Sequence, residues 1–299
     1  MALLELEFPI HTLNNRCLFA EGGTLDPETL ASLIDSDRIK RYPKSDLSKY
    51  GSLNKDTLSF LKVSPYDKIF DDPQIGSVLE TMLRVRLPQP ALEYLDYFQE
   101  NDPYTYRHLI IVYALSIILA KDLIGDEDAQ YRMFETGPSH DFGKSCTPLS
   151  VLKKETPLTR NERAMLEHHV AAGYVIMGYY LKDAECLSAA LARDHHERKD
   201  GSGYPAGIHL DDIQTEIIIA SDVYDALISQ RPYREVSYDN RTALEEITGM
   251  AERGEIGWEP LQALIGCNRE GRPHYTEVNV SLEKRGTPPA ENVYGIREE

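Results

Sequence analysis

The sequence predicts a mainly α-helical protein with a smaller N-terminal α+β domain. Apolar residues recur at helical spacing from about residue 103 to 265, where strand-like alternation is almost absent. Residues 1–95 differ, because scattered Gly, Pro and Asp interrupt their short apolar runs. With 299 residues, 41% of them hydrophobic, the chain is long enough to bury a substantial core. We expect an accessory domain of unknown function over 1–95, a catalytic helical domain over 96–265 and a partly irregular extension over 266–299.

Local signals in residues 1–95 predict a hairpin followed by helices. Segment 8–23 has the composition of a strand or a hairpin. A short helix is expected over 25–34, because Asp26 can cap it and Pro27 suits its first turn. Residues 65–98 predict two helices that are interrupted by the prolines within 87–90.

The clearest helical pattern of the catalytic domain lies near 161–181. Thr159 and Glu162 have the spacing of a capping box at its start. The longest apolar stretch, 109–120, is too short to span a bilayer and predicts a buried helix. After about residue 268 the chain becomes polar, with one strand-like stretch at 275–282.

Charge and cysteine usage narrow the classes of function. A formal net charge of -17 argues against binding to nucleic-acid polymers or anionic membranes. It does not exclude a small phosphorylated substrate, because a bound metal can reverse the local field. The four cysteines are far apart, and the start of the chain lacks a basic region and a sustained apolar stretch. We therefore expect a reduced, cytoplasmic protein.

Histidine and aspartate residues that suit a divalent metal occur on five successive segments of the predicted helical domain. Imidazole and carboxylate groups are typical ligands of divalent metals, and a two-metal site needs several of them. A helical bundle can send one or two such groups inward from each helix. The candidates are His108, His140, Asp141, His169, His195, His196 and Asp222.

Helical geometry and burial sharpen this list. Neighbouring helix residues diverge by about 100°, so the apolar face selects His169 and leaves His168 outside the site. Asp222 lies in an apolar segment, where a buried unpaired carboxylate would be costly. A metal would remove that cost, although an arginine partner or a helix terminus would also do so. Asp225 shares the face of Asp222 and could support the ligands.

Several candidates also have an ordinary structural interpretation. His108 on its own could be a surface or capping residue at the start of an apolar helix. The glycine-rich segment 201–207 could be a simple turn between helices. Arg231 and Arg234 suit phosphate or guanine recognition, but they could equally pair with acids near a helix end.

Three motifs together resemble one known family. The stretches SHDFGK (139–144), DHHERKDGSGYPAG (194–207) and SDVYDALISQRPYRE (221–235) closely resemble the HD-GYP phosphodiesterases. These form the branch of the HD superfamily that hydrolyses the bacterial second messenger cyclic di-GMP. The resemblance covers about 103–250, roughly half of the chain, and implies an HD-type helical bundle.

The resemblance also implies a site with two divalent metals, iron or manganese. Asp141 would bridge the two ions. One metal would be completed by His108, His140 and Asp222, and the other by His169, His195 and His196. Tyr104 stands four residues before His108, where some members have a glutamate for a third metal, and this argues against a third ion.

The substrate contacts implied by the resemblance lie in all three motifs. Lys144 would face the phosphate and take part in catalysis with Asp141. Tyr204 and Pro205 match the GYP motif, and Arg231 and Arg234 match positions that contact the dinucleotide. A hydroxide shared by the two metals would attack phosphorus and release the linear dinucleotide pGpG, with GMP as an open further product.

Two other functions remain as alternatives. The enzyme could act on a different phosphoester, such as another cyclic dinucleotide. It could also be a catalytically slow module that binds nucleotide or a diguanylate cyclase as a regulator. A homodimer is a further open expectation, because paired helical bundles often dimerise.

Overall fold

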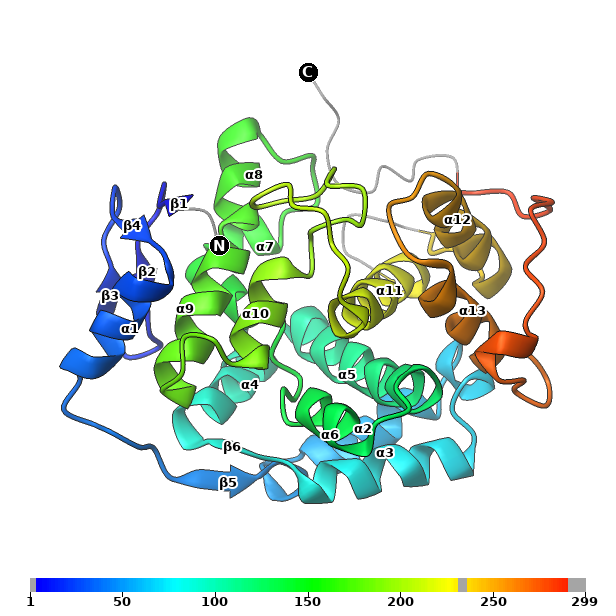
Figure 1. The fold of residues 1–299 in the computed structure, drawn as a ribbon, viewed down its shortest axis with the longest axis horizontal. Coiled ribbons are helices and arrows are strands. Elements are labelled where there is room, and N and C mark those ends of the chain that lie inside the picture. Colours follow the sequence, from blue (N-terminus) through cyan, green and yellow to red (C-terminus); the bar gives the residue numbers. More distant parts are fainter. Residues whose placement is uncertain (1–3, 231–235, 290–299) are drawn as a thin grey trace.

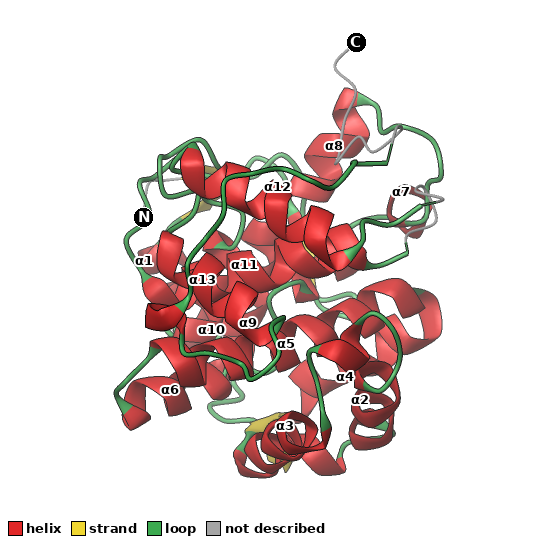
Figure 2. Cartoon of the chain, turned by 90° about the vertical axis from the view of Figure 1, so that its right-hand side faces the viewer, coloured by secondary structure: helices red, strands yellow, loops and turns green. Residues whose placement is uncertain are grey.

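The chain folds into a mainly α-helical protein, as the sequence predicts. The structure is a computed structural model and describes residues 4–230 and 236–289. Helices account for nearly all of its regular structure (Figure 2). The α-helices are α1 (Pro27–Ser36), α2 (Leu53–Leu61), α3 (Asp72–Arg84), α4 (Gln89–Asn101), α5 (Pro103–Leu123), α6 (Glu127–Phe134), α7 (Leu149–Leu152), α8 (Arg160–Glu167), α9 (His169–Leu181), α10 (Leu187–Asp194), α11 (Ile213–Ile228), α12 (Asn240–Glu252) and α13 (Trp258–Cys267).

Short strands and 3-10 turns complete the fold. Each strand pairs antiparallel with one other strand, in the pairs β1–β4, β2–β3 and β5–β6. The strands are β1 (Leu4–Glu5), β2 (Ile10–His11), β3 (Cys17–Phe19), β4 (Thr24–Leu25), β5 (Lys44–Asp46) and β6 (Arg86–Pro88). The 3-10 turns are η1 (Leu47–Lys49), η2 (Tyr66–Lys68), η3 (Phe142–Cys146) and η4 (Tyr275–Glu277).

Helix α5 is the central element of the core. It begins after Asp102, whose side chain accepts hydrogen bonds from the backbone and hydroxyl of Thr105. By length and hydropathy α5 could cross a membrane, but 78% of its apolar window is buried inside the protein. Figure 1 shows α5 in the middle of the molecule, with α9 and α10 on one side and α11 to α13 on the other. The predicted buried helix is thus confirmed.

The N-terminal region has the predicted hairpin and helices. Strands β2 and β3 form the hairpin, and Asp26 caps α1 through a reciprocal capping box with Thr29. The segment around 87–90 separates α3 from α4, as expected from its prolines. The proposed domain boundary at 95 falls within α4, and buried apolar residues form one cluster from Leu6 to Val278. The N-terminal region and the helical domain therefore share a core, and their division at 95 stays a prediction.

Two segments differ from the sequence-based expectation. The capping box of Thr159 and Glu162 is present, but the helical segment near 161–181 breaks at His168 into α8 and α9. The strand predicted over 275–282 is wrong, because this segment forms only the turn η4 followed by irregular chain. It packs on α13, where the Gln262 side chain donates to the Val278 carbonyl at 3.0 Å. This hydrogen bond thus ties the segment to a helix, and the segment does not pair with another strand.

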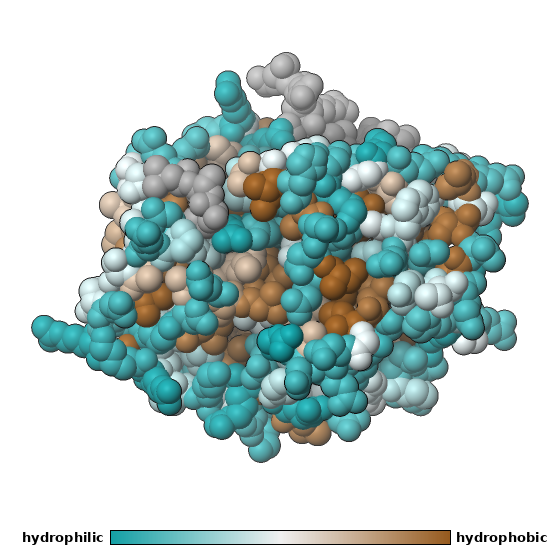
Figure 3. All heavy atoms as spheres, in the orientation of Figure 1, coloured by the Kyte–Doolittle hydropathy of each residue, from teal (hydrophilic) through white to brown (hydrophobic). Residues whose placement is uncertain are grey.

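The surface is mostly hydrophilic on the face that Figure 3 shows. Hydrophobic residues gather there in separate patches near its middle. Tyr104 is exposed at the start of α5, and Trp258 is exposed at the start of α13.

Candidate metal centre

The structure brings together all of the candidate metal ligands, which come from five segments. His108 lies on α5, and the turn before η3 supplies His140 and Asp141. The remaining ligands lie at the start of α9 (His169), just after α10 (His195 and His196) and on α11 (Asp222). Six of these residues form two groups of three, and within each group all ligand atoms lie within 4.8 Å of one another. We call His108, His140 and Asp222 the aspartate trio, and His169, His195 and His196 the histidine trio.

Asp141 lies between the two trios and turns one carboxylate oxygen toward each. Its Oδ2 is 3.4 Å from the Nε2 atoms of both His108 and His140. Its Oδ1 is 3.3 Å from Nε2 of His169 and 3.6 Å from Nε2 of His195. Two ligand atoms that bind one cation at about 2.1 Å lie about 3.0–3.4 Å apart. The separations around Asp141 therefore suit one cation at each of its oxygens.

Hydrogen bonds to Nδ1 aim three of the histidine rings into the centre. His108 Nδ1 is 2.6 Å from Asp225 Oδ2, so Asp225 has the supporting position that the sequence suggests. His169 Nδ1 is 2.5 Å from the Leu166 carbonyl, and His195 Nδ1 is 3.0 Å from the Ala192 carbonyl. In the neutral ring each acceptor holds the proton on Nδ1, which leaves Nε2 to bind a metal.

The unpaired atoms of the centre also fit a metal. The Nε2 atoms of His169 and His195 are 3.3 Å apart, although both rings use Nδ1 as the hydrogen-bond donor. Two lone pairs at that distance repel each other unless a proton or a cation lies between them. Oδ1 of Asp141 is buried without a hydrogen-bond partner among the described residues, which is costly for a carboxylate. A divalent cation would satisfy both groups.

His108 differs in protonation from His140, His169 and His196. Burial lowers the pKa of His169 to about 3 despite the nearby Asp141, and it also lowers the pKa of His140 and His196. At neutral pH these rings are neutral, the form that binds metal. For His108, burial lowers the pKa, but hydrogen bonds to Asp141, Asp222 and Asp225 outweigh burial and raise it to about 10.

The two aspartate ligands are ionised. Burial raises their pKa, but in Asp141 this is outweighed by Lys144 and neighbouring histidines, which hold the pKa well below its usual range. For Asp222, the neighbouring His108 likewise outweighs burial and holds the pKa well below its usual range. The centre thus offers carboxylate ligands in their metal-binding form.

A glycine explains how η3 comes close enough to α9. A Cβ atom on Gly143 would lie 1.9 Å from the His169 carbonyl oxygen and 2.4 Å from the Gly173 backbone nitrogen. Only glycine permits this approach, which places Asp141 beside His169. The glycine in the SHDFGK motif is therefore a packing requirement of the metal centre.

The glycine-rich segment 201–207 folds tightly over the histidine trio. A Cβ atom on Gly203 would lie 2.4 Å from the His196 carbonyl oxygen, and the Tyr204 backbone donates to that same oxygen at 3.1 Å. The Tyr204 ring stacks on His196, with centroids 4.7 Å apart and an interplanar angle of 16°. The tight loop therefore places the Tyr204 ring against the histidine trio.

Glu197 anchors this loop and was not identified from the sequence. Its side chain is fully buried and accepts hydrogen bonds from the backbone nitrogens of Ala206 at 2.7 Å and Ile208 at 3.2 Å. Its place directly after the His195–His196 pair was a usable signal, because an acid there can reach the following loop. Glu197 therefore holds the loop against the histidine trio.

The other predicted site residues have different positions. The Lys144 ammonium group contacts Asp141 Oδ2, and its side chain is 15% exposed, so it lies at the edge of the centre. His168 belongs to neither trio and packs edge-on against Phe8, with ring centroids 5.6 Å apart. Arg231 and Arg234 lie outside the described residues.

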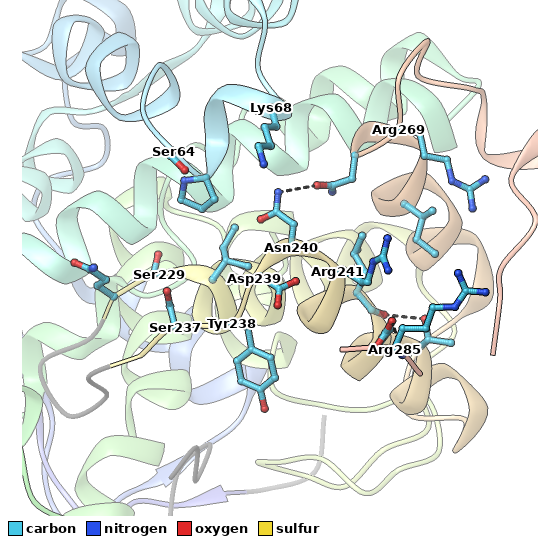
Figure 4. A pocket seen from close by; sticks show the side chains of 18 of the residues that line it. Ser64, Lys68, Ser229, Ser237, Tyr238, Asp239, Asn240, Arg241, Arg269 and Arg285 are labelled. Atoms are coloured by element: carbon cyan, nitrogen blue, oxygen red, sulfur yellow. Dashed lines mark hydrogen bonds between the residues drawn. The ribbon is translucent and has the colours of Figure 1, made fainter. Parts of the chain in front are cut away.

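A cavity of about 1250 Å³ opens next to the ends of α5 and α11 that adjoin the aspartate trio (Figure 4). None of the metal-ligand candidates, all of which are described, lines this cavity. Arg107, the neighbour of His108, and Ser229 are in its wall, and their side chains are 3.2 Å apart. The charged residues of the wall are Lys68, Arg107, Arg241, Arg269, Arg285, Asp239, Glu245 and Glu283. Among the described residues of this wall, cationic groups thus outnumber acidic ones, although the whole chain is strongly acidic.

Comparison with known proteins agrees with this geometry. The chain matches the family described as "HD domain" over residues 94–257. It is 38% identical over 120 residues to "Cyclic di-GMP phosphodiesterase response regulator RpfG" of Xanthomonas campestris pv. campestris, which covers 39% of this chain and 32% of that protein. Against "Cyclic di-GMP phosphodiesterase" of Thermotoga maritima, it is 34% identical over 200 residues, or 66% of this chain and 50% of that protein.

A third relative has a different substrate in its name. The chain is 35% identical over 134 residues to "3'3'-cGAMP-specific phosphodiesterase 1" of Vibrio cholerae serotype O1, which covers 44% of this chain and 30% of that protein. The chain thus spans between 30% and 50% of the length of these three relatives.

Proposed function

The chain belongs to the HD domain family, in its HD-GYP branch, and we propose that it is a metal-dependent phosphodiesterase that hydrolyses cyclic di-GMP to linear pGpG. The observation that carries this proposal is the position of Asp141, which turns one oxygen toward each trio. The names of two relatives, which specify cyclic di-GMP, support the choice of substrate.

In this proposal each trio would hold one divalent ion, and Asp141 would contribute one oxygen to each. Divalent ions held in this way lower the pKa of water and neutralise charge on a phosphodiester. Iron and manganese are the proposed metals, and Tyr104 offers no carboxylate for a third ion. Hydrogen bonds from Nδ1 to Asp225, Leu166 and Ala192 hold the rings of three histidines in place. These ligands therefore need not reorganise when a metal binds.

The other side chains of the centre bind and orient the substrate. Lys144 lies beside Asp141 at the exposed edge, where its ammonium group can pair with a phosphate oxygen and stabilise its negative charge. The loop held by Glu197 presents Tyr204 next to the histidine trio. Hydrolysis adds one water across a phosphorus–oxygen 3′ bond, which leaves a 3′ hydroxyl and a terminal phosphate on the linear product.

A second substrate is kept because one relative is named for 3′3′-cGAMP. Cyclic di-GMP and cGAMP share the phosphodiester ring and differ in one base, so the metal centre itself would not distinguish them. Arg231 and Arg234 are proposed to contact the dinucleotide. Onward hydrolysis to GMP, a homodimer and a diguanylate cyclase partner remain proposals that rest on the sequence.

The test combines metal analysis with a turnover assay on the full chain purified without oxygen. We expect about two equivalents of metal and conversion of cyclic di-GMP to pGpG, with cGAMP assayed in parallel. Faster turnover of cGAMP would change the substrate assignment. Two bound metals without hydrolysis of either dinucleotide would contradict the enzyme and favour the regulatory module.

A further inference from the structure

Tyr66 links the N-terminal region to the metal centre. It lies in η2, outside the segment that matches the HD domain family, and its side chain is fully buried. Its hydroxyl contacts Asp225 Oδ1 on α11 and is 2.9 Å from Ser229 Oγ. These contacts join residues that are 159 and 163 positions apart in the chain. The N-terminal region therefore places a polar group directly behind the aspartate trio.

Asp225 connects Tyr66 to His108, a metal-ligand candidate. Its other oxygen, Oδ2, is 2.6 Å from Nδ1 of His108, while His108 Nε2 is 3.0 Å from Asp222 Oδ1. A carboxylate that accepts from Nδ1 orients the imidazole and increases its basicity toward a metal at Nε2. Hydrogen bonds from Tyr66 and Ser229 fix the plane of the Asp225 carboxylate, because each occupies Oδ1 and leaves Oδ2 for His108.

The histidine trio has no equivalent support from residues 4–95, as far as the described residues show. The Nδ1 atoms of His169 and His195 bond to backbone carbonyls of their own helical segments. Phe8 contacts the neighbouring His168, which does not belong to the trio. A change at Tyr66 should therefore affect the two trios unequally.

We propose that Tyr66 is a positioning residue of the metal centre, which acts through Asp225 to hold His108 for metal binding at the aspartate trio. This inference rests on the metal-binding part of the proposed function. It assigns to the N-terminal region a direct part in building the site, beyond packing against the helical domain.

The test is a titration of the full chain with Mn²⁺ alone, which yields an affinity for each trio. The His169→Ala variant identifies the binding step that belongs to the histidine trio. Tyr66→Phe keeps the buried ring and removes only the hydroxyl. The matched control is Tyr113→Phe, since Tyr113 is also a buried tyrosine, and its hydroxyl donates to the Phe134 carbonyl at 2.7 Å.

We expect Tyr66→Phe to weaken Mn²⁺ binding at the aspartate trio by about three- to tenfold and to leave the histidine trio within about twofold. This is less than the roughly 10- to 100-fold typical when a direct partner of a ligand is removed. Asp225→Asn should show that larger loss. In the Asp225→Asn background, Tyr66→Phe should add less than about twofold, because the two residues act in series.

Three results would overturn the inference. The first is that Tyr66→Phe leaves the Mn²⁺ affinities of both trios unchanged. The second is that it lowers both affinities to the same extent as Tyr113→Phe, and the third is that its full effect persists in the Asp225→Asn background. Failure of the wild-type chain to bind Mn²⁺ would overturn both this inference and the proposed function. Mn²⁺ binding without hydrolysis of cyclic di-GMP would contradict the proposed substrate, and the Tyr66→Phe titration would still decide the inference.

Discussion

The two trios differ in what holds their histidines, although both are built from the same kinds of residue. In the aspartate trio, His108 is held by the carboxylate of Asp225, and Asp222 adds a second negative charge. In the histidine trio, backbone carbonyls hold His169 and His195, and the Oδ1 atom of the shared Asp141 lies 3.3 Å from Nε2 of His169. One half of the centre thus includes carboxylates of its own, whereas the other consists of imidazoles only.

This difference leads to different expectations for metal binding. Carboxylate-rich sites favour hard ions such as Mn²⁺, whereas imidazoles suit borderline ions such as iron and zinc. The aspartate trio should therefore bind Mn²⁺ more tightly than the histidine trio. Asp141 is the one candidate ligand that the two sites share, so its removal should weaken metal binding at both.

The largest effect is expected from Asp141→Ala. Both sites lose a ligand, so Mn²⁺ affinity at each should fall by more than about 100-fold, the upper range for loss of a residue that only supports a ligand. Turnover of cyclic di-GMP should be abolished. Metal analysis and the turnover assay measure both effects, and near wild-type activity with full metal content would refute the shared role of Asp141.

Removing one histidine from each trio should separate the two sites. His108→Ala and His169→Ala are each expected to cost about one equivalent of tightly bound metal, because each leaves the opposite trio complete. Competition between a fluorescent chelator and the protein measures the remaining affinity. Loss of both metals in both variants would show that the trios do not bind independently.

The same pair of variants tests the difference in protonation. At neutral pH and without a metal, both ring nitrogens of His108 are protonated because its pKa is raised to about 10. His169 has only one ring proton, because its pKa is lowered to about 3. Mn²⁺ must displace the His108 proton, so affinity at the aspartate trio should rise about tenfold per unit between pH 6.5 and 8.5. The histidine trio, isolated in His108→Ala, should change much less. Equal pH dependence in both variants would contradict this assignment.

A packing change should act where η3 meets the histidine trio. In Gly143→Ala the new methyl group would collide with the His169 backbone, and we expect a loss of about 1–3 kcal/mol in the free energy of unfolding. Mn²⁺ binding at the histidine trio should also weaken. Gly76→Ala is the control, because a Cβ atom there meets nothing within 4 Å and the helix α3 should gain about 1 kcal/mol. Chemical denaturation compares the two variants.

The smallest effect on the centre is expected from His168→Ala. This residue precedes a metal-ligand candidate but packs on Phe8, so both Mn²⁺ affinities should stay within about twofold of wild type. Loss of the edge-on ring contact should cost about 0.5–1.5 kcal/mol of stability. A loss of one metal equivalent would mean that the wrong member of the His168–His169 pair was selected.

The features predicted correctly from the sequence depend on near neighbours in the chain. Asp26 and Thr159 cap helices through residues three positions away, so their role is visible locally. The selection of His169 over His168 is also a matter of helical geometry. The candidate ligands His140, Asp141, His195, His196 and Asp222 lie in the three motifs, whereas His108 and His169 were selected from their places on apolar helical segments.

What the sequence did not reveal depends on distant parts of the chain. Tyr66 reaches Asp225 across 159 positions, and no local pattern marks it as part of the metal centre. The segment after Tyr275 has strand-like composition, but its place against α13 gives it a side-chain partner in place of a strand. Similarly, the helix breaks at His168 next to the point where Gly143 of η3 approaches the His169 backbone, a contact between segments that are separate in the sequence.

A crystal structure of the protein with Mn²⁺, with anomalous scattering used to locate the ions, tests directly whether Asp141 binds an ion at each trio. We predict two peaks, one at each trio, with Oδ2 of Asp141 on the ion of the aspartate trio and Oδ1 on that of the histidine trio. A single peak, or two peaks with Asp141 bound to only one of them, would contradict the account.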